Sequence, residues 1–224
     1  GYQLPKGQPF VKKYNPLLFF VLKCAAIYFT LVILLFSGFG EGYSSYFRGF
    51  GNLLFSSRWE NVKISFVPKN SQQTTLAEGH RATNISVRIN NQDYHYENGL
   101  PVLGELGVNS HLQGYLPTAL LLSLFIATPI NWKRRLKALG IGILTLHTFI
   151  AALLWVVIVG YTETNGIGIY RFGDTMKGII VWIMQITLVN QIGISFMVPL
   201  LFWMGIVGIM GEFRSLIPSR TTHI

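Results

Sequence analysis

Four apolar stretches separate the polar parts of this sequence, and they limit its fold more than any other feature. They occupy residues 17–37, 115–130, 138–160 and 178–211. A bilayer core of about 30 Å is crossed by roughly 20 apolar residues in a helix. Only 12% of the residues are charged, which is about half the fraction usual in a soluble domain. The sequence therefore predicts an integral membrane protein of the α-helical class.

We predict four transmembrane helices, with an outer segment after the first and another after the third. The spans are residues 17–37, 115–132, 138–160 and 192–211, and the outer segments are 38–114 and 161–191. The apolar stretch 178–211 is too long for one span, because its 34 residues would make a helix of about 50 Å. Two spans with a turn near "NQIG" would place the C-terminus outside. We favour a membrane-proximal outer helix over about 174–190, followed by one span that Pro199 can kink.

The net charge of +9 falls on one side of this four-span arrangement. The excess cations are Lys6, Lys12, Lys13, Lys23, Lys133, Arg134, Arg135, Lys137, Arg214 and Arg220, against Glu212. The outer stretches 38–114 and 161–177 are neutral overall. An excess of Lys and Arg in cytoplasmic segments is the positive-inside pattern. We therefore expect the lead-in 1–16 and the tail 212–224 to be cytoplasmic.

The basic stretch between Lys133 and Lys137 also raises the possibility of nucleic-acid binding. Single-stranded nucleic acid is bound by basic grooves that carry base-stacking aromatic residues, and none accompanies these cations in a water-accessible groove. We interpret the stretch as a determinant of topology and expect no nucleic-acid partner. The first apolar stretch does not end in a clear small-residue cleavage site, so we expect a retained anchor and no cleaved signal peptide.

The outer segment 38–114 has two parts. Residues 37–52 mix glycine with aromatic residues, and we interpret them as a loop at the membrane interface. A membrane-surface helix is the alternative, although the glycines disfavour a long one. Alternating apolar and polar residues between about 59 and 97 predict two or three antiparallel strands, with a hairpin connection at "NNQD", residues 90–93. Two strands alone are marginal in water, so this sheet should pack on the membrane surface, on 161–177 or on a partner.

Few residues in the predicted spans can carry chemistry. His147 is the only histidine there, and a haem or metal site would need a second ligand at its depth. Gln185, Asn190 and Gln191 could join it, but amide side chains in membranes more often form hydrogen bonds between helices. The single cysteine, Cys24, excludes an intramolecular disulfide and is expected to be a small buried residue near the inner end of the first span. The sequence predicts no catalytic set, no metal site and no cofactor.

The predicted outer face carries a mixed set of polar residues. They are Arg58, Glu60, Glu78, His80, Arg81, Asp93, His95 and Glu97. Their mixed signs are typical of a solvated or docking face, although they could assemble a site. The tripeptide from Asn84 to Ser86 matches a glycosylation acceptor, which matters only in a eukaryotic source.

The order of these segments defines a recognisable arrangement. An amino-terminal anchor and an outer β segment precede the return element "VNSHLQGYLPTALLLSLFIATP" (108–129), the basic turn "NWKRRLKALGIGILTL" and the final segment 174–211. Over residues 17–211 this resembles the bacterial inner-membrane proteins of the exosortase H-associated family. The resemblance implies an accessory protein in protein sorting or surface display, and no catalyst. An exosortase itself would need Cys, Arg and His at its outer face, whereas Cys24 lies on the inner side.

We therefore expect a non-catalytic accessory or scaffold subunit that binds membrane lipids and other integral membrane subunits of a larger complex. The resemblance favours the bacterial cytoplasmic membrane. A small enzyme or transporter using the outer polar residues with His147 and Gln191 is one alternative. Transport is disfavoured because no predicted span carries Asp or Glu and no internal repeat is visible. A lipid- or pigment-binding subunit is the other alternative.

Overall fold

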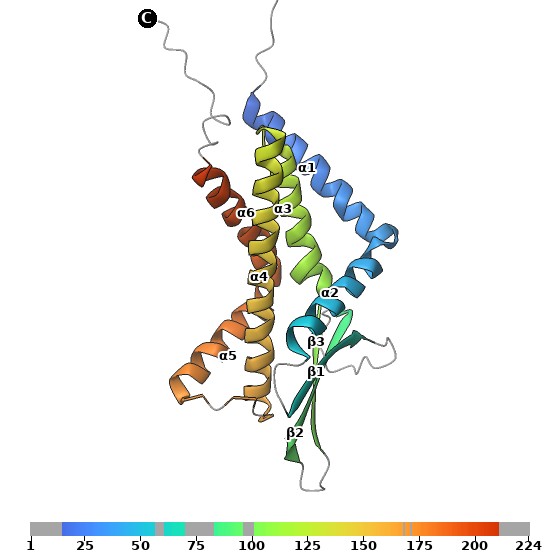
Figure 1. Ribbon diagram of the computed structural model, residues 1–224, viewed down its shortest axis with the longest axis vertical. Helices are drawn as coiled ribbons and strands as arrows, with labels where there is room; N and C mark the ends of the chain where they lie inside the picture. Colours follow the sequence, from blue (N-terminus) through green and yellow to red (C-terminus); the bar gives the residue numbers. More distant parts are fainter. Residues whose placement is uncertain are drawn as a thin grey trace, which may run out of the picture.

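The computed structural model describes residues 15–56, 61–69, 83–95, 101–167, 169–170 and 172–210. It consists of a helical bundle with a small sheet at one end (Figure 1). The helices are α1 (Pro16–Leu34), α2 (Gly40–Phe55), α3 (Leu116–Ala127), α4 (Trp132–Thr164), α5 (Asp174–Val189) and α6 (Gln191–Ile209). The antiparallel strands β1 (Val62–Pro68), β2 (Ile85–His95) and β3 (Pro101–Val108) lie side by side in that order. The predicted class, helical with a small antiparallel sheet, is confirmed.

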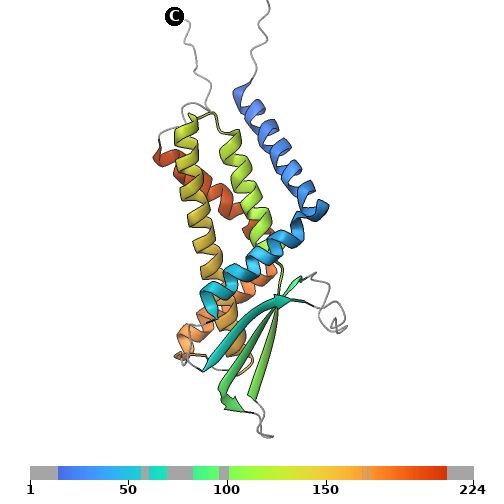
Figure 2. The same cartoon turned by 45° about the vertical axis from the view of Figure 1, so that its right-hand side comes forward.

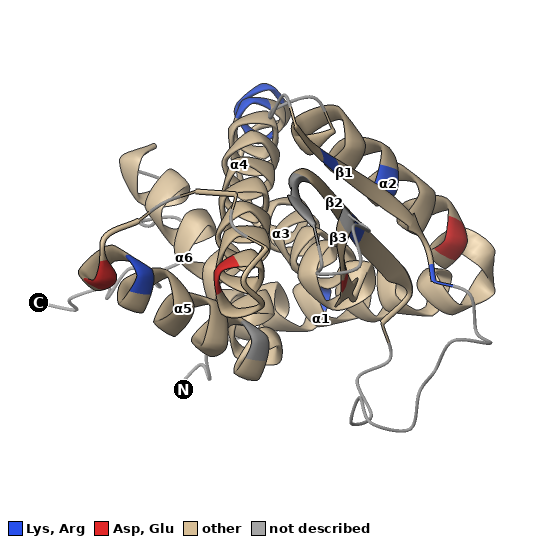
Figure 3. Cartoon of the chain, turned by 90° about the horizontal axis from the view of Figure 1, so that it is seen from below, with Lys and Arg blue, Asp and Glu red and all other residues tan. Residues whose placement is uncertain are grey.

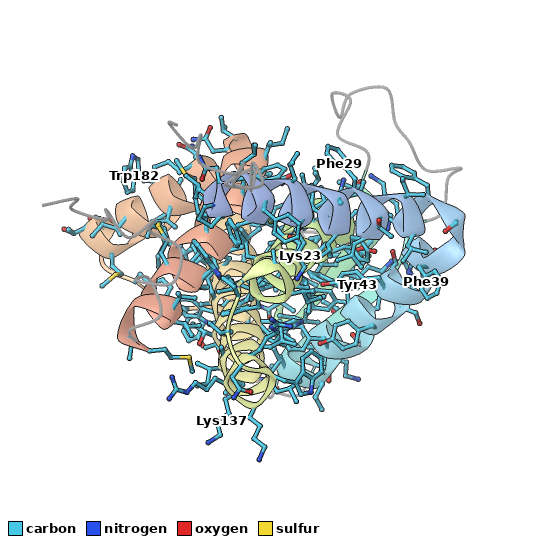
Figure 4. All side chains as sticks on the ribbon, turned by 90° about the horizontal axis from the view of Figure 1, so that it is seen from above. Lys23, Phe29, Phe39, Tyr43, Lys137 and Trp182 are labelled. Atoms are coloured by element: carbon cyan, nitrogen blue, oxygen red, sulfur yellow. The ribbon has the colours of Figure 1, made fainter. Side chains whose placement is uncertain are left out.

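Three helical segments in the described part of the chain are long and apolar enough to cross a membrane. They are Pro16–Phe55, Trp132–Thr164 and Gln191–Ile209. Exposed apolar side chains such as Phe29, Phe39 and Trp182 point away from the bundle (Figure 4), and a surface of this kind calls for lipid or a protein partner. These features indicate a membrane protein.

The predicted second span, 115–132, forms a shorter apolar helix. Together with the π-helical turn His111–Tyr115, α3 makes a continuous helix from His111 to Ala127. This helix lies at the centre of the bundle, where it packs against α1, α4 and α6. Its Leu121 and Phe125 are fully buried. The count of four spans stays a prediction.

The end of the bundle that lies opposite the sheet is fixed by the turn between α3 and α4. The Thr128 hydroxyl accepts a hydrogen bond from the Trp203 indole of α6 at 2.9 Å, and the Trp203 ring stacks on Phe20 of α1. The Arg135 guanidinium donates to the carbonyl oxygens of Thr128 and Ile130 at 3.0 and 3.1 Å. These contacts join four helices at the end that carries the basic stretch, which Figure 3 shows at the start of α4.

The interpretation of residues 37–52 as a loop is wrong, because most of them form α2. The chain turns sharply between α1 and α2 at Gly38, whose φ of 105° is open to glycine. One of the glycines that disfavour an isolated helix, Gly51, serves packing here. A Cβ on Gly51 would lie 2.7 Å from the Phe66 ring of β1, so α2 can approach the sheet closely only with glycine at this position. Burial of Phe47 and Phe55 offsets the low helix propensity.

The apolar face of the sheet packs on the helices. Val62, Ile64 and Phe66 alternate with exposed residues along β1, as the sequence predicted. The predicted hairpin at 90–93 is wrong, since β2 continues through these residues and β3 lies beyond the predicted range. The polar Asn91 can sit inside the strand because its amide donates to the carbonyl oxygen of Ile167, just after α4, at 2.7 Å.

Both outer edges of the sheet are hydrogen-bonded by helix side chains. The Asn52 carboxamide of α2 accepts from the Phe66 N–H at 2.7 Å and donates to the Phe66 carbonyl at 3.1 Å. The Tyr161 hydroxyl of α4 donates to the Glu105 carbonyl at 3.0 Å and lies 3.3 Å from the Glu105 N–H. Free strand edges pair readily with other chains, so these contacts protect the sheet while they attach it to the bundle.

The chain after α4 follows the predicted order of two helices. α5 and α6 meet at Asn190, close to the predicted boundary between an outer helix and a last span. Lys177 of α5 forms an ion pair with Glu163 of α4 at 3.4 Å. α4 has 33 residues and a length of about 50 Å, longer than the predicted span 138–160, so it extends beyond a bilayer core. Figure 2 shows its far end beside the sheet.

We expect Asn52→Ala to lower the free energy of unfolding by about 1–3 kcal/mol, because it leaves the Phe66 peptide groups without a partner. Tyr161→Phe should cost less, about 0.5–1.5 kcal/mol, because its hydrogen bonds are exposed. Unfolding by SDS titration in mixed micelles measures both. Leu53→Ala, at an exposed neighbouring position, is the control, with an expected change within about 0.5 kcal/mol. Equal effects of Asn52→Ala and Leu53→Ala would contradict the role of the edge contacts.

Candidate functional site

A cleft of about 480 Å³, partly open to the surroundings, lies between α4 and α6. One wall is a single face of α4, formed by Leu146, Phe149, Ile150, Leu153, Leu154 and Val157. The rest of the lining is formed by Gln191, Ile194, Ser195 and Val198 of α6, Thr187 of α5, and Gln113 and Pro117 of the helix His111–Ala127. This volume includes the open space at the mouth of the cleft. The lining is mostly apolar, with a few polar groups.

Two of the polar groups in the cleft are already satisfied by the protein. The Ser195 hydroxyl lies within hydrogen-bonding distance of the carbonyl oxygens of Leu112 and Gln191. The Thr187 hydroxyl donates to the Ile183 carbonyl at 2.8 Å. Within the described residues, the side-chain amides of Gln113 and Gln191 make no such bond. These two amides are therefore the polar groups that a bound molecule could engage.

The structure separates His147 from Gln191, which the sequence had grouped as candidates. His147 Nδ1 donates to the Ile143 carbonyl at 2.9 Å, and its ring packs edge-on against Tyr46 and Phe50 of α2. It does not line the cleft. His147 thus serves as a contact between α4 and α2, while Gln191 lies at the cleft.

The other candidate residues also lie apart from the cleft. Gln185 and Asn190 are exposed. Cys24 is half-buried between α1 and α3, with its sulfur 3.4 Å from the Ser123 hydroxyl. This placement is that of a packed side chain, as the sequence suggested. Among the residues that the structure describes, no group of three or more His, Cys, Asp or Glu could hold a metal ion.

The mixed polar set expected on the outer face falls outside the described part of the structure. Arg58, Glu60, Glu78, His80, Arg81 and Glu97 are outside the described residues. Asp93 and His95 belong to β2, but their side chains are outside the description as well. Their interpretation as a solvated or docking face stays a prediction.

A buried polar network that sequence analysis missed joins α2, the residue just before β2 and the start of the helix His111–Ala127. The Asn84 amide donates to the hydroxyl oxygens of Ser44 and Ser110 at 2.7 and 2.8 Å, and its oxygen accepts from the Ser110 N–H at 2.9 Å. His111 Nε2 lies 3.2 Å from the Ser44 oxygen. No sequence spacing could reveal this network, because its hydrogen-bonded side chains are separated by 26 to 67 residues in the chain.

The chemistry of this network is that of a structural junction. The Ser44 hydroxyl donates to the Gly40 carbonyl at 2.9 Å, so its proton is not available to His111. His111 Nε2 lies 3.3 Å from the same carbonyl, which favours a hydrogen on that nitrogen. A serine nucleophile needs the opposite arrangement, with an unprotonated histidine nitrogen accepting the hydroxyl proton. The amide nitrogen of Asn84, which begins the tripeptide that matches a glycosylation acceptor, donates hydrogen bonds to the two serines.

Comparison of the chain with known protein families, with curated proteins and with solved structures finds no match. We therefore infer the function from the residues and their contacts.

We expect Asn84→Ala to lower the free energy of unfolding by about 1–3 kcal/mol, because Ser44 and Ser110 lose their shared donor in a buried setting. SDS titration in mixed micelles and the rate of protease cleavage between the sheet and α2 measure the effect. Ser65→Ala, on the exposed face of β1, is the control and should leave both unchanged. An Asn84→Ala protein as stable as the wild type would exclude the junction role.

Proposed function

We propose that this protein is a non-catalytic accessory subunit of a membrane complex, in which the sheet binds a partner protein. The observation that carries the proposal is the attachment of the sheet to the helices at both edges, by Asn52 and Tyr161. In a sheet held in this way, the face that does not pack on the helices has a fixed orientation relative to the membrane. Rigid presentation lowers the conformational cost of binding a partner.

The composition of the open face supports protein binding. Ser65, Arg88 and Glu105 lie opposite one another across the three strands, and all three are exposed. Ser86 donates a hydrogen bond to the Glu105 carboxylate, which holds this acid in place. Leu103 is 64% exposed on the same face and offers an apolar anchor. A non-obligate interface is about as polar as the rest of a protein surface, so a face of this composition is compatible with protein binding.

The proposed membrane arrangement has four spans, with α3 as the second. The 17 residues from His111 to Ala127 would be about 26 Å long, close to the thickness of a bilayer core. The start of α1, the basic start of α4 and the end of α6 lie at the end of the molecule opposite the sheet (Figure 1). The positive-inside pattern then favours cytoplasmic termini and an outer sheet. The resemblance to exosortase H-associated proteins favours the bacterial inner membrane and a role in protein sorting.

We expect the sheet and the basic turn to be accessible from opposite sides of the membrane. In a Cys24→Ser background, Ser65→Cys should react with a membrane-impermeant maleimide in intact spheroplasts. Lys137→Cys should react only after the membrane is permeabilised. Both positions are exposed, so lack of reaction is not due to burial in the protein. Labelling of both residues from the same side would contradict the proposed topology.

We expect the open face of the sheet to determine which proteins co-purify from the native membrane. A chain tagged after Arg220 and extracted in mild detergent should recover its partner subunits in stoichiometric amounts. Arg88→Glu combined with Leu103→Glu should remove them without lowering the yield of the chain, because it reverses a charge and removes the apolar anchor. Lys137→Glu, at the opposite end, is the control and should keep them. Recovery of the wild-type chain alone, folded and monodisperse, would refute the accessory function.

A further inference from the structure

The length of the cleft between α4 and α6 matches one leaflet of a bilayer. The wall on α4 runs from Leu146 to Val157, which is about 16 Å along the helix axis. A bilayer core is about 30 Å thick, so this is close to half of it. If the core begins near Lys137, the exposed basic residue at the inner end of α4, the cleft occupies the half nearer the sheet.

The cleft is also polar toward one end. α3 and α6 both run from the sheet side of the bundle toward its basic end (Figure 1). Gln113 and Gln191, near the starts of these two helical segments, therefore lie toward the sheet side of the cleft. The opposite end is bordered by Leu146 and Val198, which are apolar. A molecule that fits this gradient has a hydrocarbon part directed toward the membrane centre and a polar group nearer the surface.

The two glutamines define the chemistry of that polar group. Each carboxamide offers two donors and one acceptor, and neither is used by the described residues. Polar groups at membrane depth are costly unless they find a partner. An ester or amide carbonyl at the head of an acyl chain accepts hydrogen bonds and carries no charge. It suits these amides better than an ion would, since no charged side chain lines the cleft.

We propose that the cleft binds one acyl chain of a membrane lipid from the leaflet on the sheet side. The chain lies along Phe149, Leu153 and Val198, and its carbonyl linkage accepts hydrogen bonds from Gln113 and Gln191. This site does not depend on the proposed binding of protein partners, because the sheet and the cleft are separate surfaces. It can therefore be tested on the purified chain alone.

The test uses the purified chain in nanodiscs that contain phosphatidylethanolamine with a photoreactive diazirine in one acyl chain. After irradiation, peptide mass spectrometry locates the labelled residues. The expected result is labelling concentrated on the α4 segment 146–157 and on α6 around Val198, above the level on the exposed residues of α1. Leu153→Trp should reduce labelling of the cleft by about tenfold, because the larger side chain fills it.

A matched control distinguishes the cleft from the general lipid surface. Leu144→Trp makes the same change on α4 at a residue that is 70% exposed and outside the cleft, and it should leave the labelling unchanged. If Leu153→Trp does not give a monodisperse protein, Val198→Trp fills the cleft from the opposite wall. Gln113→Leu with Gln191→Leu should weaken labelling, because the carbonyl linkage loses its donors.

The outcomes separate the lipid from other occupants. Even labelling of α1, α4 and α6, with no response to Leu153→Trp or Val198→Trp, would overturn the proposal. If a helix from a co-purifying protein were crosslinked in the cleft and no lipid were found there, the proposal would also fail. Concentrated labelling that the cleft-filling variants remove, that the double glutamine variant weakens and that Leu144→Trp leaves unchanged would support it, whether or not any protein partner binds the sheet.

Discussion

The peptide groups at the two outer edges of the sheet are hydrogen-bonded by helix side chains, and much of the structure depends on this contact. Asn52 reproduces the pairing of a neighbouring strand at Phe66, and Tyr161 does the same with one hydroxyl at Glu105. A three-stranded sheet of this size has little core of its own. Its stability comes from the helices on which it packs, so the sheet and the bundle form one unit.

This attachment explains the length of α4 and the presence of a glycine within α2. α4 is longer than a bilayer core because its last turns carry Tyr161 to the sheet. α2 contains glycine at position 51 because its axis must approach the Phe66 ring. The network around Asn84 adds a third connection, at the point where the chain passes from β3 to the helix His111–Ala127. Together these contacts fix the orientation of the sheet relative to the helices.

The sequence predicted the elements that depend on local pattern. The apolar stretches became helices, and the alternation over Val62–Phe66 and Ile85–Ile89 became strands. The loop expected at residues 37–52 and the hairpin expected at 90–93 were wrong for a common reason. Glycine and asparagine usually interrupt regular structure, but here Gly51 and Asn91 are used for contacts with distant segments. Tertiary packing reversed a local preference at both places.

The sequence by itself determined the membrane class and the apolar helical segments, because each follows from residues close together in the chain. Only the tertiary structure decided that His147 packs against α2 and that Gln191 borders a cleft. It also brought Ser44, Asn84 and His111 together. Hydrogen bonds and cavities depend on the relative positions of side chains that are distant in sequence. A single sequence carries no periodic pattern from which those positions follow.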